Sequence, residues 1–198
     1  MVLPKPTRFT EDEYYALEAA SQTKHEFVNG HIYAMTGGSP SHNTISTNLV
    51  GQLFGALRGG PCRVFSTDMA IKTLETGSVF YPDVTVVCGE PVYVPPLSIA
   101  KLENPTIIFE VLSPSTAPYD RTTKFYNYAQ IPSLKQYVLV EQDQPLIHVI
   151  NRNDANEWDA IHPLDGIDAE LTLPAVNVTL AFNDIYEQVA FNDPPHVE

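Results

Sequence analysis

The sequence contains little basic charge and no long apolar segment. Its 198 residues include 11 Lys and Arg against 24 Asp and Glu, which gives a formal net charge of -13. This balance disfavours tight nonspecific binding to nucleic acid, because such binding rests on basic side chains that neutralise phosphates. It favours solubility and the binding of cations. No segment approaches the roughly 20 apolar residues of a membrane-spanning helix, so we expect no membrane partner.

Cysteines are also few, and the beginning of the sequence is not that of a secreted protein. Cys62 and Cys88 make neither a disulfide framework nor a set of zinc ligands. Both lie in strand-like contexts, so we expect core or near-core thiols. The first residues lack the apolar region of a signal peptide, which predicts a cytoplasmic location.

Several common catalytic signatures are missing. The sequence contains no GxxxxGK[ST] phosphate loop, no GxGxxG, no GxSxG nucleophile elbow, no HExxH and no CxxC. The chemistry of the protein must therefore rest on a less regular set of residues, and two carboxylates within apolar segments are the set that stands out.

The first of these carboxylates is Glu110. It lies in the middle of residues 105–113, an apolar and β-branched segment with a proline near each end. Such a segment is typical of a central strand that is buried on both faces. A buried carboxylate is costly unless it is paired, bound to a metal or protonated. Glu110 therefore needs a partner.

The second carboxylate is Asp83, inside the β-like segment 79–87. Pro82 cannot donate to a ladder and marks an edge, a bulge or a strand start. If the two strands are neighbours, Asp83 and Glu110 converge, and Mg²⁺ or Mn²⁺ would relieve their repulsion. The alternative is that each carboxylate pairs with a Lys or Arg from a neighbouring helix.

The remaining pattern alternates between helices and strands. Thr10 with Glu13 predicts a capped helix start, and Asn29-Gly30 predicts a tight β-hairpin. Later strands are expected at 63–72, 136–140 and 146–150, with short β segments after 151. Helices are expected at 41–57, near 97–102, after Pro118 and from about Asn183.

Three more residues have two interpretations each. Glu26 lies on the first strand of the hairpin, where an ordinary exposed residue is also expected. His42 stands in the first turn of a helix, and a polar contact with a nearby loop is favoured over a metal ligand. Lys124 either pairs with Asp120 four residues earlier or reaches over the end of the Glu110 strand.

Several of these segments together resemble the Uma2 family of the PD-(D/E)XK restriction-endonuclease-like superfamily. The resemblance covers about residues 10–187. The matching pieces are residues 25–30 (HEFVNG), His42, residues 81–84 (YPDV), residues 110–116 (EVLSPST), Asp120, Lys124, Tyr128 and residues 136–140 (QYVLV).

The resemblance implies an α/β (α+β) fold with a restriction-endonuclease-like core. A mixed central β-sheet would be flanked by helices, with an N-terminal hairpin and C-terminal β additions. Residues 1–198 would form a single nuclease-like domain, with a core at about 10–187 and a flexible tail at 191–198.

The resemblance also implies a function and a site. The protein would be a metal-dependent endonuclease or phosphodiesterase that acts on DNA and forms a homodimer. Asp83, Glu110 and Glu26 would bind Mg²⁺ or Mn²⁺. Leu112 stands where the nuclease motif has its lysine, so Lys124 would serve instead, with Lys72 as the second choice. The alternative is a catalytically inactive nucleic-acid-binding, regulatory or oligomerisation protein on the same fold.

Overall fold

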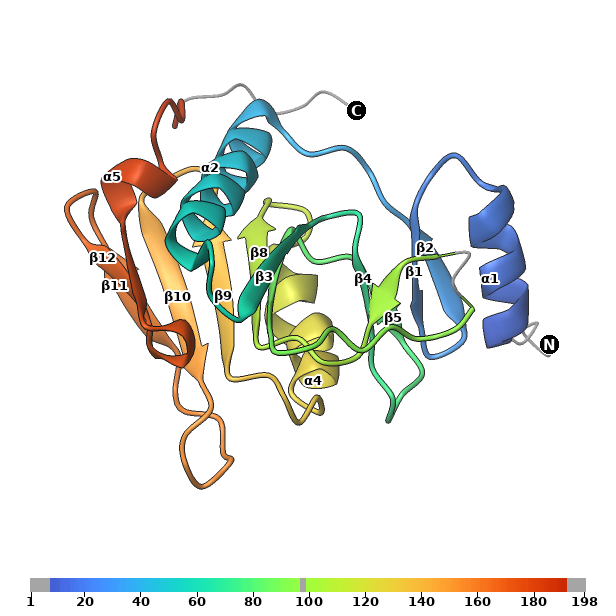
Figure 1. Ribbon diagram of the computed structural model, residues 1–198. Helices are drawn as coiled ribbons and strands as arrows, with labels where there is room; N and C mark the ends of the chain where they lie inside the picture. Colours follow the sequence, from blue (N-terminus) through green and yellow to red (C-terminus); the bar gives the residue numbers. More distant parts are fainter. Residues whose placement is uncertain (1–7, 97–98, 192–198) are drawn as a thin grey trace.

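A six-stranded sheet forms the larger part of the molecule (Figure 1). The computed structural model describes residues 8–96 and 99–191. The strands of this sheet are β3 (Cys62–Ser66), β6 (Val84–Cys88), β8 (Ile107–Leu112), β9 (Gln136–Glu141), β10 (Leu146–Asn151) and β11 (His162–Asp165). Their order is β11-β10-β9-β8-β6-β3. Strand β8 pairs antiparallel with β6 and parallel with β9, so the sheet is mixed, as predicted.

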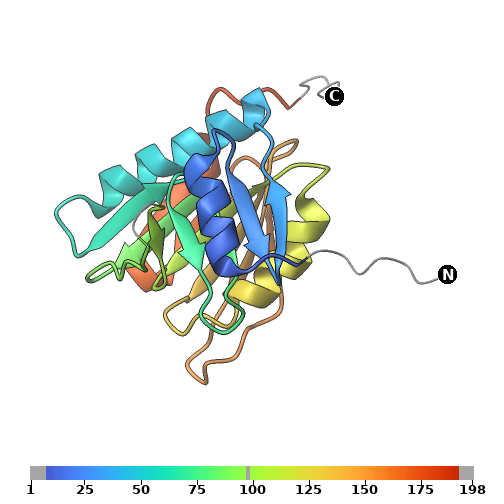
Figure 2. The same ribbon diagram turned by 90° about the vertical axis from the view of Figure 1, so that its right-hand side faces the viewer.

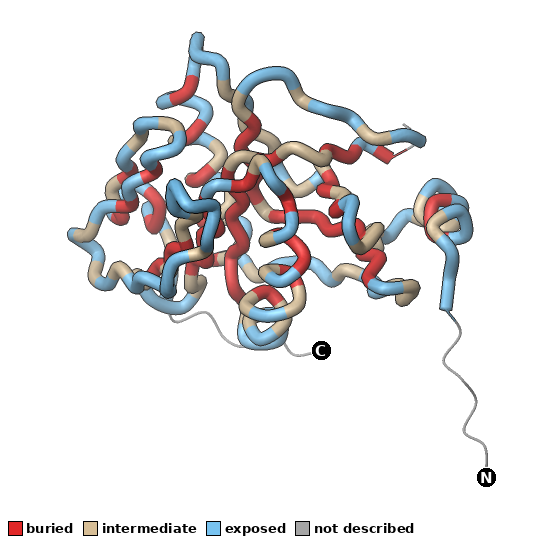
Figure 3. The backbone as a smooth tube through the Cα atoms, turned by 90° about the horizontal axis from the view of Figure 1, so that it is seen from below, coloured by how far each residue is buried: buried red, intermediate tan, exposed pale blue. Residues whose placement is uncertain are grey.

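Strand β8 is buried along its whole length, which confirms the predicted central strand. Successive side chains of a strand point to opposite faces. Ile107, Phe109 and Val111 pack in the cluster that contains the apolar face of α2 (Pro40–Leu57). Ile108 and Leu112 pack in the cluster on the other face. Glu110 therefore shares the second face, and Figure 3 shows the buried backbone concentrated in the interior.

A helical segment of three parts covers this second face. It consists of α3 (Ala117–Tyr119), the π-helix η1 (Asp120–Lys124) and α4 (Phe125–Tyr128). Pro118 lies in its first turn, as expected. π-helical turns are rare in proteins, and those that occur are often found at functional sites. Both Asp120 and Lys124 of this turn are buried.

A smaller, five-stranded sheet lies beside the first, with order β2-β1-β5-β4-β7. Its strands are β1 (His25–Val28), β2 (His31–Ala34), β4 (Ala70–Lys72), β5 (Val79–Phe80) and β7 (Lys101–Leu102). Strands β1 and β2 form the predicted hairpin, in which Asn29 and Gly30 both have positive φ. Helix α1 (Glu11–Ala20) begins with the predicted Thr10–Glu13 capping box and lies against β1 (Figure 2).

Two of the predicted strands are each divided between the two sheets. The expected strand 63–72 is β3 followed by β4, with Asp68 in the exposed turn between them. The expected strand 79–87 is β5 followed by β6, so Asp83 lies in the connection between strands rather than inside one. Pro82 stands at this break because it has no N–H for a ladder. The predictions of continuous strands were wrong, because Pro82 interrupts one of them and the turn at Thr67 and Asp68 interrupts the other.

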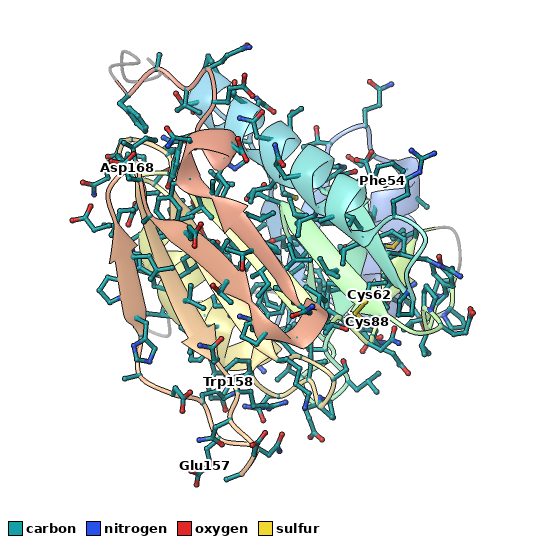
Figure 4. All side chains as sticks on the ribbon, turned by 60° about the vertical axis from the view of Figure 1, so that its left-hand side comes forward. Phe54, Cys62, Cys88, Glu157, Trp158 and Asp168 are labelled. Atoms are coloured by element: carbon teal, nitrogen blue, oxygen red, sulfur yellow. A yellow bond between two sulfur atoms is a disulfide. The ribbon has the colours of Figure 1, made fainter. Side chains whose placement is uncertain are left out.

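The prediction of free thiols was also wrong. Cys62 and Cys88 form a disulfide. They lie directly opposite each other in the antiparallel pair of β3 and β6. The bond lies near Phe54, toward the end of α2 (Figure 4). The pairing of distant strands, which a count of cysteines does not reveal, brings the two residues together.

The second half of the chain matches the sequence predictions in some elements and differs in others. Strands β9 and β10 form the predicted antiparallel pair, and β12 (Glu170–Leu173) pairs with β13 (Val178–Ala181). Helix α5 (Phe182–Ile185) lies close to the position expected for a helix, from about Asn183, whereas the 3-10 turn η2 (Pro174–Val176) was not predicted. Where a helix was expected near 97–102, residues 101–102 form β7, and 97–98 lie outside the described residues. So do residues 192–198 of the predicted tail.

Candidate active site in an acidic cleft

A cleft of about 1320 Å³ lies between the two sheets. The first turn of α2, the β1–β2 hairpin, the end of β8, the loop 113–116 and the helical segment from 117 to 124 all contribute to its walls. The predicted residues Glu26, Asp83, Glu110 and Lys124 all line it, together with His42. Distant parts of the chain therefore bring the candidate residues to one place.

Lys124 is the centre of this group. Its Nζ lies 3.0 Å from Glu110 Oε2, 3.1 Å from Asp120 Oδ1 and 3.3 Å from Glu26 Oε1. Only 8% of the Lys124 side chain is exposed. Both interpretations of Lys124 hold at once, because it pairs along its own helix and also reaches the Glu110 strand. Burial by itself lowers the pKa of Lys124, but the carboxylates outweigh it and hold the pKa well above its ordinary value.

Glu110 is, with Asp120, the most deeply buried carboxylate of the group. Its Oε1 accepts a hydrogen bond of 3.1 Å from the Tyr128 hydroxyl, and its Oε2 faces Lys124. Burial raises the pKa of Glu110 well above its ordinary value. Lys124 lowers this pKa, while Asp120, Asp83 and Glu26 raise it further. Four carboxyl groups, of Glu26, Asp83, Glu110 and Asp120, therefore crowd around one ammonium, and burial with their repulsion favours a proton on Glu110.

Glu26 is not the exposed strand residue that one interpretation expected. It is 5% exposed, and its Oε1 accepts from the backbone N–H of Tyr81 at 3.3 Å. Its Oε2 accepts from the Tyr119 hydroxyl at 3.0 Å. Three donors, including Lys124, thus hold this carboxylate on the face that looks into the cleft.

Asp83 is fixed by two donors from different elements. Its Oδ2 accepts a hydrogen bond of 2.7 Å from the backbone N–H of Val111, and its Oδ1 lies 3.2 Å from His42 Nε2. Continuing the β6–β8 register by one residue beyond Val84 places Asp83 beside Glu110. Strands β6 and β8 are neighbours, as the convergence of the two residues requires, although Asp83 has already left its strand. Glu110 also has the lysine partner from a helix that the alternative expected.

His42 makes a polar contact with a nearby loop, which is the interpretation favoured from the sequence. The loop residue that it contacts is Asp83, so His42 also lies in the candidate site. Burial is the largest single influence and lowers the pKa of His42, but the hydrogen bond and charge of Asp83 together with the charge of Asp120 outweigh it, so the pKa is raised above its ordinary value. The imidazole also packs on Gly38, where an added Cβ would lie 2.6 Å from Nδ1. The sequence singles out His42 but not its contact with Asp83, since the two residues are far apart in the chain and carry no common spacing.

Lys72, the second choice, lies elsewhere. Its Nζ is 2.6 Å from Glu11 Oε2 and stands over the ring of Tyr15. Leu112, at the position of the usual motif lysine, is buried in the apolar core. Among the lysines considered, Lys124 is the one that the fold places in the cleft.

The loop after β8 carries several hydroxyl groups, to which the sequence analysis assigned no role. Ser113 Oγ lies 3.0 Å from both Ser115 Oγ and Thr116 Oγ1, and all three residues line the cleft. Two tyrosines bind the carboxylates: Tyr119 donates to Glu26 and Tyr128 to Glu110. Tyr128 follows Lys124 by four residues and belongs to the family resemblance, whereas Tyr119 was not predicted.

The donor chemistry of the cleft suits a hard divalent cation. Asp83 and Glu110 both line the cleft and offer carboxylate oxygens, which are hard ligands. Within residues 8–96 and 99–191, however, no group of three His, Cys, Asp or Glu residues is arranged as a metal site. Mg²⁺ often binds through one or two carboxylates, with waters and substrate phosphates as the other ligands. The pair fits that mode, and the role of Glu26 as a third ligand stays a prediction.

Comparison with known proteins agrees with this fold. The Uma2 family model, described as "Putative restriction endonuclease", matches residues 11–182. Two uncharacterised proteins of Synechocystis sp. are similar. One, slr1290, is 34% identical over 93% of this chain and 94% of its own length, and the other, sll1609, is 36% identical over 72% and 80%.

A solved structure has the same fold. It is described as a putative nuclease belonging to DUF820 from Anabaena variabilis, with a TM-score of 0.74 and 16% identity over 90% of this chain and 98% of that one. At this identity the likeness concerns the fold alone. The predicted α/β restriction-endonuclease-like architecture is confirmed.

Proposed function

Because this chain belongs to the Uma2 family, we propose that it is a metal-dependent phosphodiesterase that hydrolyses nucleic acid, with DNA as the substrate. The observation that carries the proposal is the convergence of Asp83, Glu110 and Lys124 in one cleft. Buried carboxylates that repel one another are costly to the fold, so a function at this place explains their presence.

Asp83 and Glu110 are the residues that would hold Mg²⁺ or Mn²⁺, with Glu26 as the further carboxylate expected from the family resemblance. A cation at this place would polarise a phosphate oxygen and lower the pKa of water. His42 and the Val111 N–H fix the Asp83 carboxylate from two sides, so that its orientation is set before the substrate arrives.

Lys124 contributes electrostatic stabilisation in this proposal. Its carboxylate neighbours keep it charged, which suits it to stabilise the extra negative charge of a pentavalent phosphorus and makes it a poor proton acceptor. Glu26 and Asp120 hold the ammonium in place from two sides. Their role is to position Lys124 next to Glu110.

The test is cleavage of plasmid, linear duplex and single-stranded DNA with Mn²⁺ or Mg²⁺. We expect cleavage that EDTA abolishes and that Asp83→Asn and Glu110→Gln each reduce by at least about 100-fold, as for other groups that act on the transition state. Asp68→Asn is the matched control, because this aspartate is exposed in a turn and pairs with Lys24. If the wild type leaves every substrate intact, or if Asp83→Asn cleaves as well as Asp68→Asn does, the proposal fails.

A second candidate is a non-catalytic binding or regulatory protein on the same fold. Leu112 replaces the usual lysine, and Lys124 already partly neutralises the acidic group. Thermal-shift titration with Mn²⁺ separates the two candidates. A nuclease site predicts stabilisation that Asp83→Asn weakens, whereas an unchanged melting temperature favours the second candidate.

Two further expectations remain predictions, namely the homodimer and the cytoplasmic location. In the described part of the chain no helix is long and apolar enough to cross a membrane. The disulfide between Cys62 and Cys88 counts against a cytoplasmic location, because such bonds are rare in the reducing cytosol.

A further inference from the structure

The rim of the cleft carries an exposed aromatic ring next to the acidic group. Tyr33 on β2 is 49% exposed and lines the cleft. It lies directly opposite Glu26 in the β1–β2 pair, and residues opposite each other project from the same face of a sheet. The hairpin register therefore directs Tyr33 and Glu26 toward the same space.

A second ring connects Tyr33 to the charged centre. The ring centroids of Tyr33 and Tyr119 are 6.3 Å apart, and the Tyr119 hydroxyl donates to Glu26. Tyr119 is thereby held in place, and it supports Tyr33 from one side. The exposed surface of Tyr33 remains open at the mouth of the cleft, one ring away from the Glu26–Lys124 pair.

The charges of the cleft argue against a duplex held by its phosphates. Lys24 and Lys124 are the lysines among the described lining residues, and both are already paired with carboxylates. The carboxylates along the same walls are Glu26, Asp83, Glu110, Asp120 and Asp143. Duplex binding depends on several basic contacts to phosphates, which these walls do not offer. Stacking of bases on aromatic rings needs no such contacts.

We propose that Tyr33, supported by Tyr119, is a stacking platform for an unpaired base, so that the cleft accepts single-stranded nucleic acid in preference to duplex. This inference rests on the proposed function for its substrate class. A base stacked on Tyr33 would lie next to Tyr119, whose ring contacts Lys124 and whose hydroxyl donates to Glu26, and the loop 113–116 lines the same cleft.

The experiment measures binding without cleavage. The full chain, in EDTA, is titrated into a short oligothymidylate that carries one 2-aminopurine, and into the same strand as a duplex. We expect the single strand to bind more tightly and its fluorescence to change on stacking. Tyr33→Ala should weaken binding about 5- to 150-fold, and Tyr33→Trp should retain it. Between about 50 and 200 mM salt the affinity should change less than about tenfold, since few phosphates are neutralised.

Tyr93→Ala is the matched control, because Tyr93 is similarly exposed at 47% but lies outside the described lining of the cleft. It should bind like the wild type. Circular dichroism of both variants checks that they are folded. The inference is overturned if the duplex binds as tightly as the single strand, if neither binds, or if Tyr33→Ala binds as well as Tyr93→Ala. Mn²⁺-dependent cleavage, measured separately, decides the nuclease proposal whichever way binding turns out.

Discussion

Replacement of Lys124 by methionine tests the central argument about the acidic group. Lys124→Met keeps a side chain of similar length but removes the ammonium that Glu26, Glu110 and Asp120 share. Three buried carboxylates then face one another without a counter-charge. We expect a large loss in the free energy of unfolding, because an uncompensated buried charge is far more costly than a lost surface pair.

The size of the loss follows from the burial of the group. Breaking a buried ion pair by removing one partner costs about 3–5 kcal/mol, which is a large share of the roughly 5–15 kcal/mol of a typical domain. At about 2–4 °C per kcal/mol for a chain of this length, the melting temperature should fall by roughly 6–20 °C. Lys24→Met removes the pair with Asp68, whose side chains are 37% and 83% exposed, and should cost less than about 1 kcal/mol.

The loss should also depend on pH. Burial raises the pKa of Glu110, and the removal of Lys124 raises it further. The folded variant then keeps a proton at pH values where the unfolded chain has lost it, so its stability falls as pH rises above the ordinary value of 4.5. Urea unfolding followed by circular dichroism should show a greater deficit relative to wild type at about pH 8 than at about pH 5.5. A deficit that equals that of Lys24→Met, or one that does not change with pH, would refute the reasoning.

Three further predictions concern backbone and packing. Gly38→Ala should push the His42 ring away from Asp83 and reduce Mn²⁺-dependent cleavage by about 10- to 100-fold, whereas Gly37→Ala, with nothing near its Cβ, should leave the rate unchanged; equal rates would count against His42 as a positioning residue. Gly51→Ala, at an exposed and open position in α2, should raise the free energy of unfolding by about 1 kcal/mol in a thermal melt, and a decrease would contradict the assigned helix. Reduction of the disulfide, which closes a separation of 26 residues, should lower stability by about 3 kcal/mol in urea unfolding with and without dithiothreitol; identical curves would show that the bond does not form in solution.

The sequence pattern was most informative where a local rule decides the structure. The capping box at Thr10 and the turn at Asn29-Gly30 depend on residues that are close in the chain, and both are found. The buried strand around Glu110 was predictable because apolar, β-branched residues have few other places in a fold. The lone carboxylate in that strand was predicted to need a partner, and it has one in Lys124; its role in catalysis stays a prediction.

The errors arose where distant residues decide the structure. Pro82 signals an edge, a bulge or a strand start, but nothing local indicates that the chain passes there into another sheet, or that Cys62 and Cys88 are paired across β3 and β6. The contact of His42 with Asp83 likewise depends on how α2 packs over the sheet. Pairing and packing of this kind follow from the whole fold, so the members of the site could be guessed one by one but not their arrangement.

The alternation of side chains along β8 limits how this chain can vary in length. Insertion or deletion of a single residue within the strand, upstream of Glu110, would rotate the carboxylate into the apolar layer beneath α2 and an aliphatic side chain into the cleft. Changes of length are therefore tolerable in the connecting loops but not in this strand. The six residues of β8, which lie at the centre of the sheet, therefore also determine the face of the sheet on which Glu110 lies.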